Sequence, residues 1–174
     1  SIVQKYVPQD MAPFPMGYSR SKRFRKILEC VLDPTPSAAD TPMLKILLGK
    51  SFESTDVLLC AIKRLTVREK RYQSLHLFSR LTVTGYTPPR RVSFQERKWL
   101  VRAFETVEFG HRLACHAKPF FNYAWLLRTL LHEAGLQEHA TYVKRLRCKE
   151  RLVYYTELLK KVRHAYTAVR VLDG

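Results

Sequence analysis

The stretch CKERLVYYTELLKKVRHAYTAV, residues 148–169, decides the fold class of this chain. Its apolar residues recur at alternating spacings of four and three, which is the heptad pattern of an α-helix with one buried seam. The seam consists of Cys148, Leu152, Tyr155, Leu159, Val162, Tyr166 and Val169. Because a seam this short usually packs within its own domain, we expect the helix to lie against other helices of the same chain.

Two further amphipathic helices are predicted before this one. A capping box that starts at Ser93 opens a helix that runs to about Ala117. The next helix begins at Pro119 and ends at Gly135. Because the connections are short, the three helices should pack as antiparallel neighbours, and we assign residues 93–174 to a C-terminal three-helix lobe.

The N-terminal half also has helical periodicity, and we assign residues 20–84 to an N-terminal helical lobe. Apolar spacing predicts a helix from Arg20 to Leu32, which Asp33-Pro34 ends. A short helix follows over Met43–Leu48. The apolar pattern from 54 to 79 fits one long helix or two short ones, with any break near Thr66-Val67.

Two segments lack any period. Residues 1–19 contain three prolines and a glycine, which indicates an extended Pro-rich arm. Residues 85–92 contain Pro88-Pro89 and read as a linker between the lobes. The sequence therefore predicts an all-α fold: an irregular helical bundle of about five to six helices in two lobes, with an extended N-terminal arm.

The charge of the chain indicates a negatively charged partner. Its 174 residues contain 31 Lys and Arg against 15 Asp and Glu, which gives a formal net charge of +16 and a pI near 10.0. Such self-repulsion is most simply explained by a standing polyanionic partner such as RNA. The apolar fraction of 46% is ordinary for a folded protein, so the charge does not indicate disorder.

The cations gather in clusters along the whole chain. The first cluster lies in the opening turns of a helix, where the helix dipole disfavours cations. We therefore expect negative charges outside the fold to offset this unfavourable interaction. An import signal is the alternative reading of that cluster. The candidate RNA-binding residues are Arg20, Lys22, Arg23, Arg25, Lys26, Lys63, Arg64, Arg68, Lys70, Arg71, Arg90, Arg91, Lys144, Arg145, Arg147 and Lys149.

Four aromatic residues could add stacking to these charges. Tyr6, Phe14, Tyr18 and Tyr86 lie near arginines or in segments without helical period, and we expect them to be exposed. Exposed aromatic rings stack on unpaired bases.

No metal, cofactor or catalytic site is predicted. The four cysteines are far apart and fit no zinc or redox motif, so we expect buried free thiols. His111 continues an apolar stripe and is interpreted as a core histidine, although Cys115 and His116 lie nearby. Carboxylates do not cluster, and no nucleophile stands beside a base, so no catalytic residue is assigned.

These features favour a non-catalytic, RNA-contacting structural or assembly component of a large ribonucleoprotein, with a mitochondrial ribosome as the best guess. The expected partners are ribosomal or other structured RNA and neighbouring proteins, without a membrane span or a small-molecule substrate. We expect location in the mitochondrial matrix, and the start at Ser1 would fit removal of a presequence.

Two other functions fit the composition. The first is an accessory helical subunit of an organellar respiratory or membrane-associated complex, with its charge facing anionic lipid. The second is a nucleic-acid-modifying enzyme with an unrecognised site.

Overall fold

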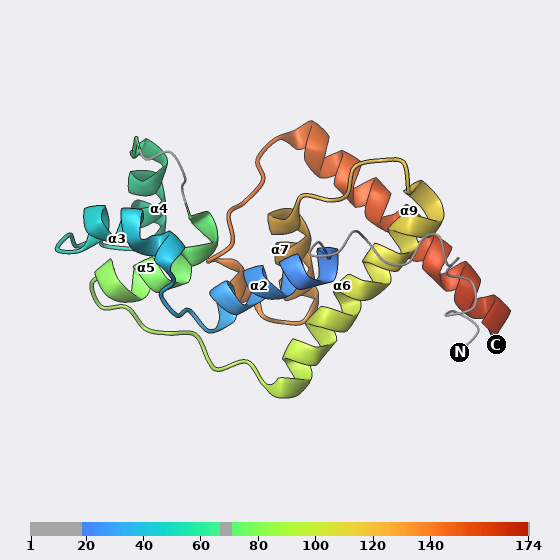
Figure 1. Cartoon of the computed structure of the whole chain (residues 1–174), viewed down its shortest axis with the longest axis horizontal. Helices are drawn as coiled ribbons and strands as arrows, with labels where there is room; N and C mark the ends of the chain where they lie inside the picture. Colours follow the sequence, from blue (N-terminus) through green and yellow to red (C-terminus); the bar gives the residue numbers. More distant parts are fainter. Residues whose placement is uncertain (1–18, 67–70, 174) are drawn as a thin grey trace.

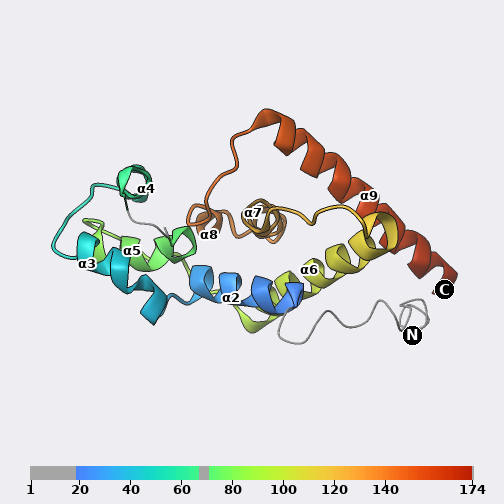
Figure 2. The ribbon, with the colours of Figure 1, turned by 45° about the horizontal axis from the view of Figure 1, so that its top comes forward.

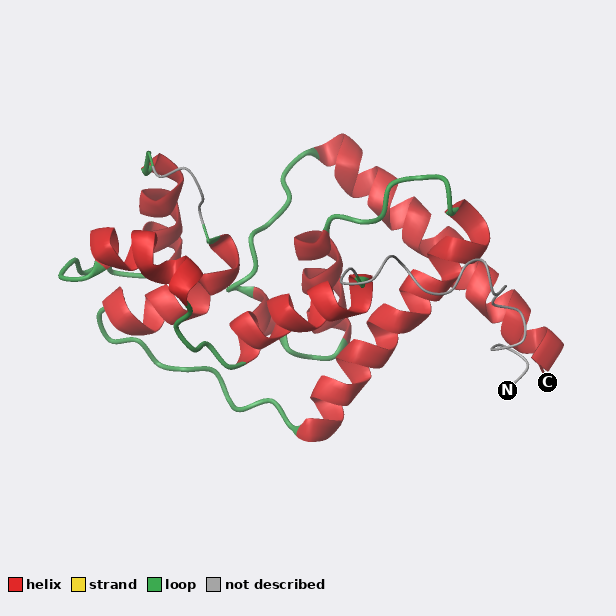
Figure 3. Ribbon diagram, viewed as in Figure 1, coloured by secondary structure: helices red, strands yellow, loops and turns green. Residues whose placement is uncertain are grey.

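α-Helices make up the fold of this chain. A computed structural model describes residues 19–66 and 71–173, and these ranges are all-α, without a β-strand (Figure 1) (Figure 3). An isolated parallel bridge joins Phe52 to Val83. Residues 1–18 of the predicted arm lie outside the described residues, and Ser19 serves as the N-cap of the first described helix.

Eight α-helices and two 3-10 turns follow one another in the described ranges. The number exceeds the predicted five to six because residues 54–79 contain two helices and because α8 is too short to have a recognisable period. In chain order the elements are α2 (Arg20–Leu32), η1 (Ala38–Asp40), α3 (Thr41–Leu47), α4 (Thr55–Arg64), η2 (Tyr72–Ser74), α5 (Leu75–Thr82), α6 (Phe94–Cys115), α7 (Tyr123–Glu133), α8 (Gln137–Ala140) and α9 (Lys149–Asp173).

The sequence predicts α2 with its observed bounds. The hydroxyl of Ser19 accepts a hydrogen bond from the main-chain N–H of Lys22, which caps the first turn. The helix ends before Asp33, whose own N–H still bonds back into the last turn. The buried face of the helix consists of Phe24, Leu28, Val31 and Leu32.

α2 packs antiparallel against α6. The rings of Phe24 and Phe104 stack with centroids 4.2 Å apart and planes 9° from parallel. Near the start of α2, Arg25 pairs with Glu105 at 3.0 Å. At the other end of the contact, Arg97 of α6 pairs with the acidic side chains that end α2. Apolar stacking and ion pairs therefore fix the same register.

α6 crosses α9 at a glycine. Gly110 lies against the backbone of Val162, and a Cβ atom placed on Gly110 would stand 2.2 Å from the carbonyl oxygen of Val162. Any side chain at this position would have to push the two helices apart.

The heptad seam of α9 is buried in its middle. Tyr155, Leu159 and Val162 are buried, and Leu158, which the seam omits, is buried beside them. The prediction was wrong for Cys148, which is exposed and precedes the first turn of α9. A 25-residue helix is far longer than one crossing, so its ends extend beyond the packed region (Figure 1).

The predicted start of α7 was wrong by four residues. Pro119 lies in the loop after α6, and the helix begins at Tyr123. The side-chain oxygen of Asn122 accepts a hydrogen bond from the N–H of Trp125 at 3.0 Å, so Asn122 caps the helix in place of the proline. At the other end, Gly135 has φ +76°, which stops the helix as expected.

The buried-thiol prediction holds for one of the four cysteines. Cys115 is buried and Cys30 is half-buried, but Cys60 and Cys148 are exposed. Cys60 lies two residues from each of the buried positions 58 and 62 of α4, which places it on the opposite face of that helix.

α2 lies between two groups of helices (Figure 2). α3, α4 and α5 gather at one end of the molecule, and α6, α7 and α9 at the other (Figure 1). The buried apolar residues of both groups nevertheless belong to one hydrophobic cluster. Residues 85–92 connect the groups, and Val92 within them is buried. The division into two lobes stays a prediction.

Three buried histidines hold connecting segments in place. Each ring bonds a main-chain carbonyl in another part of the chain, and burial lowers the pKa of each imidazole below its ordinary value of 6.5. The neutral ring is therefore the folded form, and the core-histidine interpretation of residue 111 is confirmed. The bonds run from His76 to Val31 at 2.7 Å, from His111 to Pro119 at 3.2 Å and from His139 to Arg90 at 2.9 Å.

We expect Gly110→Ala to destabilise the protein by about 3 kcal/mol, because the new methyl group would overlap the backbone of α9. An alanine in a helix ordinarily stabilises it relative to glycine, so the sign itself is informative. Chemical unfolding measures the change, with Lys98→Ala on the exposed face of α6 as the control. Adding Val162→Ala should not restore stability, because the overlap is with a carbonyl oxygen and not with the valine side chain.

We expect the free energy of unfolding to fall as the pH decreases through 6.5. The three buried imidazoles stay neutral in the folded protein, so the unfolded chain binds more protons below the ordinary pKa, and stability is complete only above it. Unfolding curves between about pH 8 and pH 5 measure this slope. His139→Gln should reduce the slope, because it removes one of the three buried imidazoles. A flat profile would contradict the neutral assignment.

Candidate nucleic-acid interface

A groove of about 990 Å³ runs beside α2. Its walls come from α2, the loop that follows it, the segment 71–73, the start of α7 at 122–124 and the segment 142–144. We call this the α2 groove. It brings together parts of the chain that are more than 100 residues apart in the sequence.

The lining of the α2 groove is strongly basic. Glu29 is its acidic residue, and Arg97 of α6 already pairs with Glu29. All of the cations belong to the predicted RNA-binding set, and they come from three separate sequence clusters. They are Lys22, Arg23, Arg25, Lys26, Arg71 and Lys144.

A ladder of stacked groups supports one wall. Phe104 stacks on Phe24 and also faces Tyr123, with a centroid distance of 6.0 Å and an interplanar angle of 28°. The guanidinium of Arg23 lies over the Tyr123 ring, 4.3 Å from its centroid. Arg23 is exposed, so a series of ring contacts that begins at the buried Phe24 ends at a cation on the surface.

The groove lining contains a second cation on an aromatic ring. The ammonium of Lys144 lies 4.1 Å from the centroid of the Tyr72 ring. Two residues earlier, the buried ring of Tyr142 stacks on His76 at 4.4 Å. Arg128 of α7 donates to the carbonyl oxygens at 140 and 143, which fixes this segment from behind.

Asp40 organises the end of the groove. Its carboxylate accepts hydrogen bonds from the hydroxyl of Ser74 at 2.6 Å, from the N–H of Ser37 at 2.9 Å and from the guanidinium of Arg71 at 3.1 Å. Burial alone would raise the pKa of Asp40, but these hydrogen bonds outweigh it and hold the pKa below the ordinary value. Arg71 therefore lines the groove as one half of an ion pair.

Acids within the fold engage part of the first basic cluster. Arg20 pairs with the buried carboxylate of Glu108 at 3.7 Å, and Arg25 pairs with Glu105. The expectation that compensation comes from outside the fold was therefore wrong for these two arginines. Lys22 and Lys26 are exposed, and among the described residues neither has a charged partner.

The second and third clusters are divided. Lys63 and Arg64 are exposed in the last turn of α4 and do not line the α2 groove. Arg68 and Lys70 lie outside the described residues. Of these clusters, the structure places Arg71 alone at the groove.

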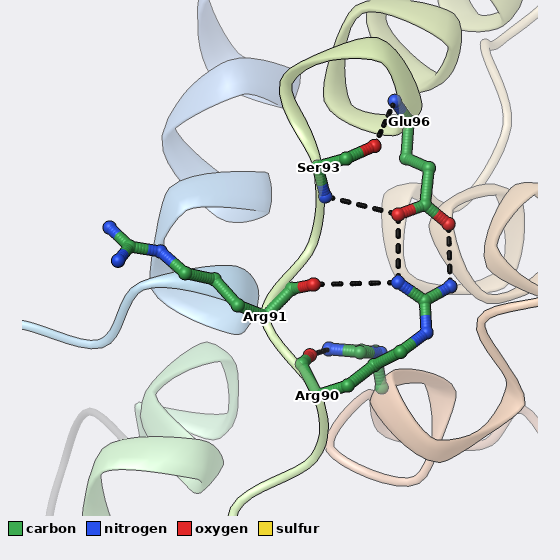
Figure 4. A network of polar contacts seen from close by, with 5 residues as sticks. Arg90, Arg91, Ser93 and Glu96 are labelled. Atoms are coloured by element: carbon green, nitrogen blue, oxygen red, sulfur yellow. Dashed lines mark hydrogen bonds and ion pairs between the residues drawn. The ribbon is translucent and has the colours of Figure 1, made fainter.

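Arg90 makes its contacts within the fold (Figure 4). Its guanidinium donates to both carboxylate oxygens of Glu96 at 2.8 and 2.6 Å, and Glu96 also completes the capping box of α6 with Ser93. The Arg90 bond is the main reason why the pKa of Glu96 falls to about 2. The side chain of Arg91 points away from this network (Figure 4).

The last cluster continues away from the groove. Arg145, Arg147 and Lys149 are exposed between the groove wall and the first turn of α9. They make no ion pair with other described residues and do not line the α2 groove. They extend the positive surface beyond Lys144.

The aromatic prediction was only partly tested. Tyr6, Phe14 and Tyr18 lie outside the described residues. Tyr86 is half-buried, with its hydroxyl buried, and packs against the rings of His76 and Tyr142, so the expectation of an exposed Tyr86 was wrong.

Sequence reasoning missed Tyr72, Asn122, Tyr123 and Tyr142 as groove residues. Each belongs to a segment that is far in sequence from α2, and no local pattern shows that these segments meet. Asn122 carries a partial signal, because a helix cap places it at a helix start and near the surface.

No family model, curated protein or solved structure matched the chain. Across 19–66 and 71–173, no group of three His, Cys, Asp or Glu side chains is arranged to hold a metal ion. In the same ranges, no helix is both long and apolar enough to span a membrane.

We expect Asp40→Ala to lower the free energy of unfolding by about 3 kcal/mol, since it strips a buried ion pair of one partner. Glu53→Ala is the matched control, because Glu53 is exposed and the change in net charge is the same. The contribution of Asp40 is present above the ordinary carboxyl pKa of 3.8 and is lost as the pH falls through the lowered value. Equal stability of the two variants at neutral pH would show that Asp40 does not organise the groove.

Proposed function

We propose that this protein is a non-catalytic, RNA-contacting structural or assembly component of a large ribonucleoprotein, and that the α2 groove is a principal RNA contact. The observation that carries the proposal is the convergence of cations from α2, from Arg71 and from Lys144 on one groove. These residues come from three separate segments that together span more than 100 positions, so a local charge run does not explain their meeting.

The electrostatics of the groove support a polyanion. Lys22, Lys26 and Lys144 are exposed lysines with no acidic partner among the described residues. Bringing like charges together costs free energy. Binding to a phosphate backbone offsets this cost, because the lysines neutralise phosphates and release the counterions condensed on them. The basic surface that continues through Arg145 and Arg147 supports an extended ligand over a small one.

Exposed apolar side chains support protein neighbours as well. Val153 and Tyr154 near the start of α9, and Val171 and Leu172 at its end, are between 47% and 72% exposed. Apolar groups that protrude from both ends of one helix fit burial against other subunits of an assembly. This feature also fits the alternative, an accessory subunit of an organellar protein complex.

The finer parts of the proposal rest on the sequence. A mitochondrial ribosome in the matrix is the best guess for the particle, because a basic all-α chain with a Pro-rich arm suits a structured RNA with many protein neighbours. The two-lobe division, at 20–84 and 93–174 with a linker at 85–92, belongs to the same proposal.

We expect the purified protein to bind structured RNA with strong salt dependence. If about six phosphates are neutralised, the logarithm of affinity falls with the logarithm of salt at a slope near −5. Replacing Lys22, Lys26 and Lys144 by Gln should weaken binding and flatten the slope by about 2 to 3. Fluorescence anisotropy at several salt concentrations measures both quantities.

The control is a second triple variant with the same change in net charge. Lys45, Lys50 and Lys118 are exposed and lie outside the α2 groove, so their replacement by Gln should change the slope much less. Equal effects of the two triples would mean that only total charge matters. Binding that does not depend on salt would contradict the RNA proposal and favour the protein-complex alternative.

A further inference from the structure

We propose that the α2 groove takes an unpaired nucleobase of the RNA, stacked on the outer side of the Arg23 guanidinium, with neighbouring phosphates on Lys22, Lys26 and Lys144. This inference rests on the proposed function and specifies the part of the RNA that the groove binds as an unpaired segment. It follows from the groove's lining, from the stacked ladder beneath Arg23 and from the polar groups at its sides.

The lining of the groove is apolar between its cations. Ile27, Val31, Ala124 and Val143 line it together with the rings of Tyr72 and Tyr123. A surface that only follows the phosphates of a duplex has no use for an apolar recess, because a duplex keeps its bases inside. An unpaired base offers both an apolar face to bury and a charged backbone to leave at the rim.

Arg23 presents a flat surface for that base. Its guanidinium lies over Tyr123, Tyr123 faces Phe104, and Phe104 stacks on the buried ring of Phe24. Among the described residues, no acid pairs with Arg23 and no second ring stacks on it. Because contacts with the core already hold Tyr123 beneath Arg23, a base that stacks on the exposed guanidinium would cost little further side-chain entropy.

Polar groups beside the stack suit a base edge. The side-chain oxygen of Asn122 caps α7, which leaves the amide N–H groups of Asn122 as donors at the groove. Gln73, which follows Tyr72 in the sequence, brings a second amide to the groove lining. Amide side chains are uncharged and carry hydrogen-bond donors and an acceptor, so they can bond to the edge of a base.

The test compares three RNAs of equal length on the wild-type protein. They are a single strand of about 12 nucleotides, the same strand annealed to its complement, and a strand whose nucleotides are all abasic. Electrostatics alone would favour the duplex, which has the higher charge density. We expect the intact single strand to bind about 10-fold more tightly than either of the others, which corresponds to one stacked base.

Arg23→Lys separates stacking from charge. It retains the cation and removes the plane, so affinity for the intact strand should fall about 5- to 10-fold, whereas affinity for the abasic strand and the salt slope stay the same. Arg64→Lys, outside the groove, is the matched control. Circular dichroism and unfolding curves confirm that the variants fold alike.

The outcomes distinguish this inference from the proposed function. If the abasic strand or the duplex binds as well as the intact strand, the base site is overturned, whereas salt-dependent RNA binding through the groove lysines stands. An equal loss for all three RNAs in Arg23→Lys overturns it as well. If none of the RNAs binds and vesicles of anionic phospholipid do, both the inference and the RNA function fail.

Discussion

The contact between Phe24 and Phe104 is the interaction on which the rest of the structure depends. It places α2 across α6 in the antiparallel register that the flanking ion pairs also require. The same Phe104 ring supports Tyr123, and Tyr123 supports Arg23, so the core contact extends to the wall of the α2 groove. Replacing either phenylalanine by a smaller residue would therefore disturb the fold and the groove together, because one stack serves both.

Ion pairing within the fold distributes the large net charge unevenly. The acids that pair in the described residues bind mainly arginines, such as Arg25, Arg71 and Arg97, whose planar guanidinium suits a carboxylate. Lysines at the groove are left without acidic partners. A formal charge of +16 therefore overstates the number of cations that a ligand can use, and the position of the unpaired ones matters more than the total.

Local signals predicted the helices well and the site poorly. The bounds of α2, the capping box at Ser93 and the middle of the α9 seam follow from periodicity and capping chemistry, which act within a few residues. The start of α7 was misjudged because two local signals, Pro119 and Asn122, compete. The predicted cations of the groove were found by charge alone. Their meeting was not predicted, because it depends on α2 lying beside segments that are distant in the sequence, at Arg71 and at Lys144. Charge clustering also gave no means of knowing that Arg20, Arg25 and Arg90 have acidic partners inside the fold.

The three histidine bonds have a consequence for how the molecule opens. Loops usually exchange their amide hydrogens through small local fluctuations that leave the core intact. Here the end of α2, the loop before α7 and the connection before α6 are each held by a buried ring from another element. Releasing any of these segments exposes an imidazole nitrogen and the apolar groups around it, so the opening of a connection is coupled to loosening of the helix that holds it. The boundaries of the cooperative units are therefore expected to fall elsewhere than at these connections.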